Sequence, residues 1–574
     1  MKKHISILII LLSMVSFAQV KDTLGTEVIN IVKPYTPTVS DAFKIKSSPE
    51  IDSSAIGSKK QIEYSIFSIP VASTFTPAKG KAKVLKVNPS PPVYDNYISA
   101  GFGNFTTPGV ELFAHGNTTR YNDFGLFFDY ISSKGGINDV VLDNDYFDTN
   151  LDLFYKQDQR DFNWQLNSGF RMQKYNWYGL AEHINYSQNL LDGIDEEIRY
   201  TDIYLGGKID YKDSFFKGAT VESNLFADGK GSTEAHFLAQ PKIEFPIASE
   251  YINADMRIEF LKGQFASDYM NVDNINYTFF TAGFSPSLEI LRNNLTVNLG
   301  VHLLYSSGSG SDNKNKGYYY PNVNASYKLI DEVLTVYAGV TGGLHQNTFK
   351  GFANENPYVS PTLTIKRTDE QYNGFFGLKG KLASNIAYNF KASYKNERDK
   401  PLYKLNQSKT DGAIPTTHGY QIGNSFNVLY DTISTISAFG EVTIDLSKQL
   451  KLGGNFEFNQ YDTKNEAEAW NLPRLKASAF VNYNNDNWFA GADLFYVGKR
   501  KDQLVINVPL SFTVTNIIIG DYVDLNFNGG YKFNEKLTVF GKVNNVLSSD
   551  YQKYTNFYVQ GLQVFGGLTY KFDF

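Results

Sequence analysis

The chain has 574 residues, and its 39 Tyr, 44 Phe and 46 Gly are spread without a change of composition after about residue 93. Its net charge is -5, from 54 basic and 59 acidic residues, and this mild balance gives no support for nucleic-acid binding, which needs clustered basic patches. Cysteine is absent, which excludes disulfides, Cys-based metal sites and thiol catalysis.

Residues 1–18 are typical of a secretory signal peptide. Two lysines at positions 2 and 3 precede a mostly apolar segment at 7–15, and Ser-Phe-Ala at 16–18 forms a small-x-small cleavage site. We therefore expect the mature chain to start at Gln19. No later stretch approaches the roughly 20 apolar residues of a membrane helix. Export without a helical anchor leaves secreted, periplasmic and outer-membrane locations.

Residues 19–92 differ from the rest because eight prolines interrupt them, at positions 34, 37, 49, 70, 77, 89, 91 and 92. Such a broken segment does not predict a packed domain. We expect an extended, proline-rich periplasmic arm, with short strands at Glu27–Val32 and Gln61–Ile66. A disordered leader that acts only as a spacer is the alternative.

From Tyr94 onward, strands of ten to fifteen residues are separated by alternately short and long connections. The short connections are predicted at residues 120–123, 158–161, 292–294, 330–332, 383–385, 447–449, 484–487 and 534–536. The long ones are predicted at 133–144, 173–197, 264–275, 306–316, 345–369, 398–422, 462–471, 501–520 and 548–559. This rhythm is typical of a transmembrane β-barrel, with periplasmic turns on one rim and extracellular loops on the other.

The last strand, Gly561–Phe574, shows the two faces that such a barrel needs. Read with period two, one face is apolar and the other mostly polar. The apolar face is Leu562, Val564, Gly566, Leu568, Tyr570, Phe572 and Phe574; the other is Gln563, Phe565, Gly567, Thr569, Lys571 and Asp573. Aromatic residues at the end of the strand suit the boundary of a bilayer.

The predicted fold is therefore all-β, an antiparallel transmembrane barrel of about 22 strands over residues 93–574. The number is even because both ends of the barrel are expected on the periplasmic side. A soluble sheet of that size would have to split into domains, and no linker separates the strands. A secreted soluble adhesin is excluded on the same ground.

Several segments of the second half resemble the barrel of TonB-dependent outer-membrane receptors. They are residues 355–361 (ENPYVSP), 370–380 (EQYNGFFGLKG), 439–442 (FGEV), 472–476 (LPRLK), 543–547 (VNNVL) and the ending 561–574. Their order and spacing cover roughly residues 345–574, whereas residues 94–344 share only the barrel rhythm. The resemblance implies an outer-membrane barrel without enzymatic activity, surrounded by lipid.

The chain departs from that family in its N-terminal region. About 75 mature residues precede the first strand, which is too few for the family's plug domain, so we expect the plug to be absent. One strip is similar to a TonB box, the acidic and apolar segment to which the energising protein adds as a strand. The strip is Thr26, Glu27, Val28, Ile29, Asn30, Ile31 and Val32. An ordinary short β-segment is the alternative.

A plugless barrel of this size would be a wide hole, so something must close it. The candidates are the arm, long loops folding inward, a TonB-type protein, or another outer-membrane or periplasmic protein. Two functions remain: a receptor-like or channel-like transporter that binds or passes a solute, and a structural subunit of a larger outer-membrane assembly or secretion complex. No catalytic residue, cofactor site or metal site is predicted.

The strongest ligand-contact candidates are aromatic residues at loops. They are Tyr175, Trp177 and Tyr178 in one long connection and Tyr318, Tyr319 and Tyr320 at a boundary between loop and strand. These rings could stack on a sugar or an aromatic ligand. The alternative is that they belong to the aromatic girdle that flanks the apolar band of such barrels.

Overall fold

The computed structural model describes residues 94–573, apart from residues 120, 248–249, 311 and 509–510. The predicted signal peptide at 1–18, the arm at 19–92 and its two short strands lie outside the described residues, as does the TonB-box-like strip.

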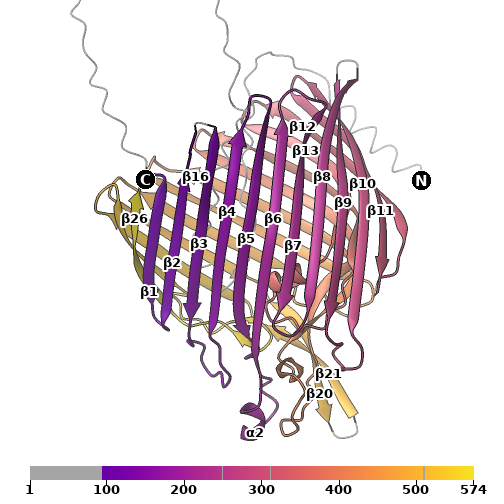
Figure 1. Ribbon diagram of the computed structural model, residues 1–574, viewed down its shortest axis with the longest axis vertical. Coiled ribbons are helices and arrows are strands. Elements are labelled where there is room, and N and C mark those ends of the chain that lie inside the picture. The colour runs from indigo at the N-terminus through magenta and orange to yellow at the C-terminus, as the bar shows by residue number, and fades with distance from the viewer. Residues whose placement is uncertain (1–93, 120, 248–249, 311, 509–510, 574) are drawn as a thin grey trace, which may run out of the picture. The chain divides into compact units, whose positions relative to one another are not determined.

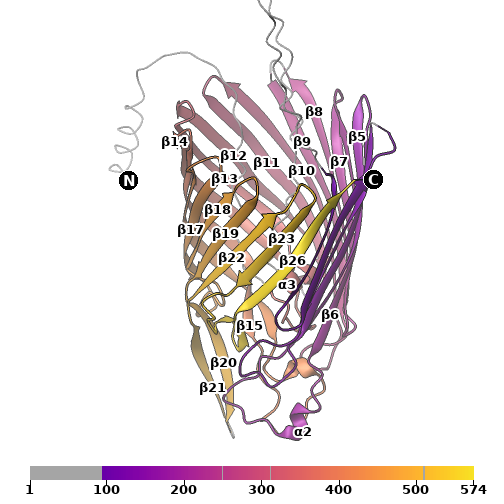
Figure 2. The same cartoon turned by 90° about the vertical axis from the view of Figure 1, so that its left-hand side faces the viewer.

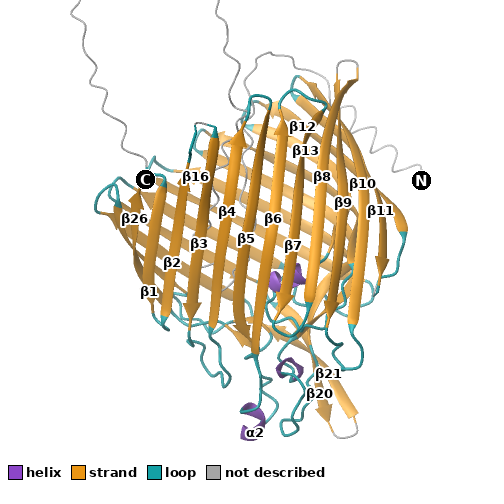
Figure 3. Ribbon diagram, in the orientation of Figure 1, coloured by secondary structure: helices purple, strands orange, loops and turns teal. Residues whose placement is uncertain are grey.

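Twenty-two strands form one closed antiparallel barrel (Figures 1 and 3). The first eleven are β1 (Asn96–Gly103), β2 (Thr107–Gly116), β3 (Asn122–Ser133), β4 (Tyr146–Asp158), β5 (Phe162–Asn176), β6 (Glu197–Tyr211), β7 (Phe216–Asp228), β8 (Thr233–Ile247), β9 (Glu250–Phe265), β10 (Ile275–Arg292) and β11 (Leu295–Ser309). The other eleven are β12 (Lys316–Ile330), β13 (Leu334–Gln346), β14 (Arg367–Ala383), β15 (Ile386–Leu405), β16 (Phe426–Asp445), β17 (Leu450–Thr463), β18 (Leu475–Asn484), β19 (Trp488–Val497), β22 (Tyr522–Lys532), β23 (Leu537–Asn544) and β26 (Gln563–Phe572).

The barrel closes where the first strand meets the last. Strand β1 pairs antiparallel with β26 from Asn96↔Phe572 to Gly103↔Phe565. The hydroxyls of Ser99 and Thr569 share a hydrogen bond of 2.9 Å across this seam. The number of strands and the closing role of the last strand are therefore confirmed, and no edge is left in the barrel wall.

Short and long connections alternate around most of the barrel as predicted, although the connections at 104–106 and 229–232 on the long-loop rim are also short. Both ends of the described wall, Asn96 and Phe572, lie on the short-turn rim, and the longer connections lie on the opposite, long-loop rim. The long connections carry structure of their own: α2 (Gln188–Leu191), α3 (Phe349–Glu355), the 3-10 turn η2 (Gly419–Gln421), and the hairpins β20 (Arg500–Val508) with β21 (Ser511–Ile519) and β24 (Gln552–Tyr554) with β25 (Phe557–Tyr558). Neither hairpin was predicted.

The two faces of the wall follow the sequence alternation. On β26, Val564, Leu568 and Tyr570 are 46–52% exposed on the outer face. Thr569 and Lys571 occupy the alternate positions and face the lumen, in register with Ser99 and Tyr97. A band of exposed apolar side chains outside and polar side chains inside is what a bilayer requires of a barrel. Among the described residues, no helix combines the length and apolarity needed to cross a membrane.

The large buried side chains come both from the wall strands and from the long connections. The largest buried cluster combines inward-facing, mostly aromatic residues at the long-loop end of the strands with residues of five long connections. Figures 2 and 3 place α3 within the outline of the barrel, near the long-loop rim. The centre of packing is therefore at one end of the lumen.

Candidate functional site: a loop that closes one end of the barrel

The connection between β13 and β14, residues 347–366, folds into the barrel and is here called the capping loop. It begins with a local helix signal, because the Thr348 side chain accepts a 2.9 Å hydrogen bond from the backbone N–H of Gly351. Helix α3 ends at Glu355 since Asn356 precedes Pro357, and a residue before proline is driven out of the helical conformation. The loop then continues as extended chain.

Phe349 anchors the start of this loop in the wall. Its ring meets those of Phe265, Phe226 and Tyr200 edge to face, at centroid distances of 4.9, 5.2 and 6.1 Å. Phe349 itself is 1% exposed. Burying a side chain of this size contributes about 1.5 to 3 kcal/mol, and edge-to-face pairs add to it.

Tyr358 anchors the second half of the loop. Its ring stacks on Phe557 of β25 at 3.9 Å, and its hydroxyl lies 3.2 Å from that of Tyr178. The next residue, Val359, forms a parallel bridge with Phe426 at the start of β16, and both are 0% exposed. Two far-apart regions of the barrel rim are thus joined through the loop.

A buried carboxylate holds the first turn of α3. Glu234 of β8 is 2% exposed and accepts hydrogen bonds from the backbone N–H groups of Phe349 at 2.7 Å and Lys350 at 3.1 Å. The Tyr277 hydroxyl donates a third at 2.7 Å. Beside it, the Lys350 ammonium lies 2.6 Å from a carboxylate oxygen of Asp202 on β6. Hydrogen bonds to charged acceptors are worth about 1.5 to 3 kcal/mol each when buried.

Four further hydrogen bonds reach the middle of the loop from different parts of the molecule. The Tyr200 hydroxyl donates to the Pro357 carbonyl at 2.9 Å, and the Trp177 indole N–H donates to the Tyr358 carbonyl at 3.2 Å. Glu355 receives two more at 2.9 Å, on its carbonyl from Tyr554 and on its carboxylate from Tyr403. The loop is therefore fixed on several sides, and its apolar cluster lies at the long-loop end of the barrel.

Below the capping loop, charged residues on the inner wall are paired across strands. Glu259 of β9 lies 2.9 Å from a ring nitrogen of His236 on β8, and 2.5 Å from a guanidinium nitrogen of Arg257 on its own strand. On β4 and β5, the Arg171 guanidinium donates twice to Asp148, at 3.0 and 2.6 Å. Among the described residues, no three His, Asp or Glu side chains are grouped so as to hold a metal ion. The inner wall at these strands is therefore a polar surface of paired charges.

The β20–β21 hairpin behaves differently, since it projects beyond the long-loop rim (Figures 1 and 2). Its base is bonded to neighbouring parts of the chain. Asp502 is fully buried and accepts hydrogen bonds from the backbone N–H of Leu405 at 3.2 Å, that of Gln503 at 2.8 Å and the Thr555 hydroxyl at 2.7 Å. Burial raises the pKa of the Asp502 carboxyl above its ordinary value, against the opposing effect of these hydrogen bonds.

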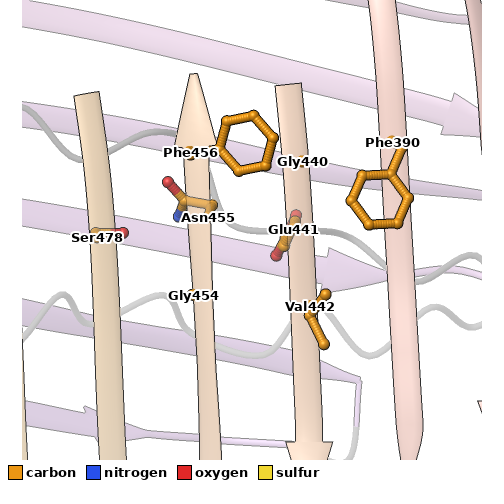
Figure 4. A pocket seen from close by; sticks show the side chains of 8 residues that line it. All are labelled: Phe390, Gly440, Glu441, Val442, Gly454, Asn455, Phe456 and Ser478. Carbon is orange, nitrogen blue, oxygen red and sulfur yellow. The ribbon is translucent and has the colours of Figure 1, made fainter. Parts of the chain in front are cut away.

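A shallow depression on the wall, shown in Figure 4, lies away from the capping loop. It forms where Gly440 leaves room for the ring of Phe456, which a Cβ at that position would meet at 2.3 Å. Phe390 and Phe456 are each 43% exposed on the outer face, while Glu441 occupies the alternate, inward position of β16. The depression therefore belongs to the apolar outer surface.

Three of the predicted ligand-contact residues lie at the capping loop. Trp177 is 0% and Tyr178 6% exposed, and both contact Tyr358. The Trp177 indole N–H donates to the Tyr358 backbone carbonyl, and the Tyr178 hydroxyl lies 3.2 Å from the Tyr358 hydroxyl. Tyr175 is half-buried against the same cluster, with its ring 6.4 Å from that of Tyr358. These positions face into the barrel, unlike those of an outer girdle. Their contact with a ligand stays a prediction, and it would require the cluster to open.

The other three predicted residues divide between the two faces of β12. Tyr318 and Tyr320 face inward, stack with their centroids 6.1 Å apart and belong to a small separate cluster. Tyr319 lies between them on the outer face and is 82% exposed, as a girdle residue would be. The two groups of aromatic residues are not brought together by the fold. Ligand contact by this group also stays a prediction.

The residues that fix the capping loop were not singled out from the sequence. Asp202 and Glu234 sit on separate strands, and Phe349 and Lys350 lie in a connection that was predicted only as a long loop. Thr348, followed by Gly351 and by Asn356-Pro357, is a helix start and stop that could have revealed α3. No local sequence signal indicates that α3 contacts the wall.

Comparison with known proteins agrees with this architecture. The family model described as "TonB dependent receptor-like, beta-barrel" matches residues 93–546. The chain belongs to this family. It is therefore a protein of the outer membrane, its short-turn rim is periplasmic and its long-loop rim is extracellular. Comparison with curated proteins gives no match.

Solved structures with a similar fold include two receptors and one transporter. The ferripyoverdine receptor of the outer membrane of Pseudomonas aeruginosa, bound to ferripyoverdine, has a TM-score of 0.61 at 13% identity, over 84% of this chain and 72% of that one. The copper transporter OprC gives 0.60 at 11% identity, over 84% and 82%. A mutant of the ferric enterobactin receptor of Pseudomonas aeruginosa, in complex with enterobactin, gives 0.58 at 12%, over 83% and 81%. At such identities the likeness concerns the fold.

Proposed function

We propose that the protein takes up a solute across the outer membrane, and that the capping loop is its extracellular gate. The observation that carries this proposal is the buried aromatic cluster with which residues 347–366 occupy the extracellular end of the lumen. A barrel kept only as a scaffold has no need of a loop fixed inside it by a buried carboxylate and by hydrogen bonds from several strands. Family membership and the receptor and transporter neighbours support the same function.

The alternative of a structural subunit in a larger assembly or secretion complex receives no support from these comparisons. In the proposed function, the apolar outer face contacts outer-membrane lipid. A TonB-type protein binding the strip at residues 26–32 is the proposed source of energy. No enzymatic step is proposed.

Conductance of the purified full-length protein in planar bilayers tests the gate. The test variant replaces residues 348–357 with a short Gly-Ser linker. Its matched control replaces residues 503–516 of the β20–β21 hairpin, which also belongs to a long connection but projects beyond the rim. We expect stable channel openings from the first variant and the low conductance of the wild type from the second.

Two outcomes would count against the proposal. If the loop-replaced variant stays silent while its barrel is folded, the capping loop is not the gate. If both variants conduct equally, the effect reflects general loosening of the extracellular rim. Retention of the fold is checked by the shift in gel mobility on heating that folded barrels show.

A further inference from the structure

The capping loop covers a pocket in the inner wall that combines aromatic rings with two carboxylates. This wall pocket consists of Tyr200, Phe226, Phe265, Tyr277, Asp202 and Glu234, from strands β6 to β10. The strand registers place Asp202 beside Phe226 and Phe226 beside Glu234 in one row of inward-facing side chains. All six residues therefore belong to strands of the barrel wall.

With the capping loop in place, the pocket residues are buried. Its four aromatic residues are 1–3% exposed, Glu234 is 2% exposed and Asp202 is 9% exposed. Tyr277 can lie flat over the neighbouring strand only because its cross-strand partner is Gly263, where a Cβ would meet the Tyr277 ring at 2.2 Å. The glycine at position 263 therefore makes room for the Tyr277 ring.

Two adjacent residues of the capping loop occupy this pocket. Phe349 inserts its ring among Phe226, Phe265 and Tyr200, and Lys350 places its ammonium 2.6 Å from Asp202. Together they present an aromatic group and a cation from one point of the chain. The wall pocket therefore already holds a group with this chemistry, tethered to the loop.

Withdrawal of the loop would leave the two carboxylates without these partners. Glu234 would lose two of its three hydrogen-bond donors, and Asp202 would lose its cation while keeping the amide of Asn224. A buried carboxylate without a partner is costly, so the open state requires water or another cation at this position. Aromatic rings around a cation stabilise it further through their negative faces.

We propose that the wall pocket is a solute-binding site for an amphipathic cation, a molecule with an aromatic body and an ammonium group. Phe349 and Lys350 act as its built-in occupant in the closed state. The inference rests on the proposed function, because it takes the capping loop to be a gate that opens. A solute that binds the pocket then competes with the loop, and by linkage its binding favours the open state.

Calorimetric titration of the full-length protein with 2-phenylethylammonium tests the site. In the variant Phe349→Ala with Lys350→Ala, which vacates the pocket, we expect binding at least tenfold tighter than in the wild type. Adding Asp202→Asn should weaken that binding about tenfold. Neutral 2-phenylethanol, which has the same body without the charge, should bind the vacated pocket at least tenfold more weakly than the cation.

A matched control removes the same two kinds of side chain elsewhere in the capping loop. Phe352→Ala with Lys366→Ala deletes the edge contact with Tyr403 and the ion pair with Asp399, and leaves the wall pocket filled. We expect less than a twofold gain in affinity. Equal gains in the two double variants would overturn the proposal, as would equal binding of 2-phenylethanol and the cation.

A second measurement uses the wild type, so the test does not depend on the folding of a variant. Saturating 2-phenylethylammonium should increase hydrogen exchange in residues 348–355, and 2-phenylethanol should not. Absence of both cation binding by the vacated variant and this increase would refute the site. If the loop-replaced variant nevertheless conducts, the gate stands and only the wall pocket fails. If the cation binds the vacated variant but the loop-replaced variant does not conduct, the wall pocket stands and the gate fails.

Discussion

The capping loop and the β20–β21 hairpin belong to two long connections on the same rim, but they fold in opposite directions. The capping loop turns inward and buries Phe349, Val359 and Leu363 to 1% or less. The hairpin projects outward and leaves Val514 47% and Ile518 67% exposed. Both contain apolar residues, so composition alone does not decide which connection enters the lumen.

The difference lies in what the wall offers to each connection. The capping loop meets a set of inward aromatic rings and a carboxylate, Glu234, that satisfies the first backbone N–H groups of α3. The hairpin satisfies its own backbone by pairing β20 with β21, and residues at its base such as Asp502, Arg500 and Lys501 hold it to neighbouring connections. A connection closes the barrel when the wall provides partners for it. The following substitutions test that distinction.

The largest effect is expected from Glu234→Ala. This substitution leaves the N–H groups of Phe349 and Lys350 and the Tyr277 hydroxyl without an acceptor in a buried place. The free energy that keeps the loop closed should fall by on the order of 3 to 5 kcal/mol. Hydrogen exchange of residues 348–355 should rise accordingly, while exchange in β20 and β21 stays at the wild-type rate. An unchanged rate in the loop would show that Glu234 does not hold it.

A smaller effect is expected from Gly263→Val. The new side chain would collide with the Tyr277 ring, since even a Cβ would lie 2.2 Å from it. Overpacking of this kind costs about 1 to 3 kcal/mol. We expect a lower midpoint of thermal unfolding and faster exchange in α3, through the displaced Tyr277 hydroxyl. Gly541→Val provides the control, because a Cβ there meets nothing closer than 3.9 Å; an equal loss in both variants would contradict this account.

Lys350→Gln should have a modest effect on the loop. The ion pair with Asp202 is partly exposed, with 31% of the Lys350 side chain and 12% of the Asp202 side chain accessible. Pairs of this kind contribute about 0.5 to 1 kcal/mol. The expected result is a two- to fivefold increase in exchange of α3, and a much larger increase would mean that the pair is the main latch. Lys366→Gln is the matched control on the same loop.

The smallest effect concerns the pH dependence of the hairpin. Because burial raises the pKa of Asp502, the contribution of this group to stability is full below the ordinary aspartate pKa of 3.8 and is lost as the pH rises through the raised value. Local opening at Leu405 and Gln503, corrected for intrinsic exchange, should therefore increase with pH by roughly a few-fold. Asp502→Asn should remove the trend. A profile that rises equally in both proteins would refute the role of this carboxyl.

The barrel could be predicted from the sequence because its signals are local. Alternation along a strand such as Gln563–Phe572 has period two, and each turn or loop interrupts it. The number of strands then follows from counting, and the exposed Val564, Leu568 and Tyr570 confirm the predicted outer face. Residues near each other in the chain carry all of this information.

The gate could not be predicted in the same way, because its contacts join distant parts of the chain. Glu234 and Phe349 are 115 residues apart, and Trp177 and Tyr358 are 181 apart. Which loop contacts which strands depends on how the barrel closes. From the sequence, inward folding of the long loops is therefore only one of several candidates for closing the lumen. The aromatic residues of the 173–197 connection were selected for their chemistry, and only the fold brings them to Tyr358.

The most direct test of the gate is labelling of the lumen from outside the cell. The natural chain has no Cys, so Lys391→Cys places a single thiol on the inner wall of β15, below the capping loop, and Ile518→Cys places one on the hairpin. A membrane-impermeant maleimide added to intact cells should label Ile518→Cys at once and leave Lys391→Cys unlabelled. Combining Lys391→Cys with replacement of residues 348–357 should make the lumenal thiol reactive. Rapid labelling of Lys391→Cys with the loop intact, or protection that persists without the loop, would contradict the account.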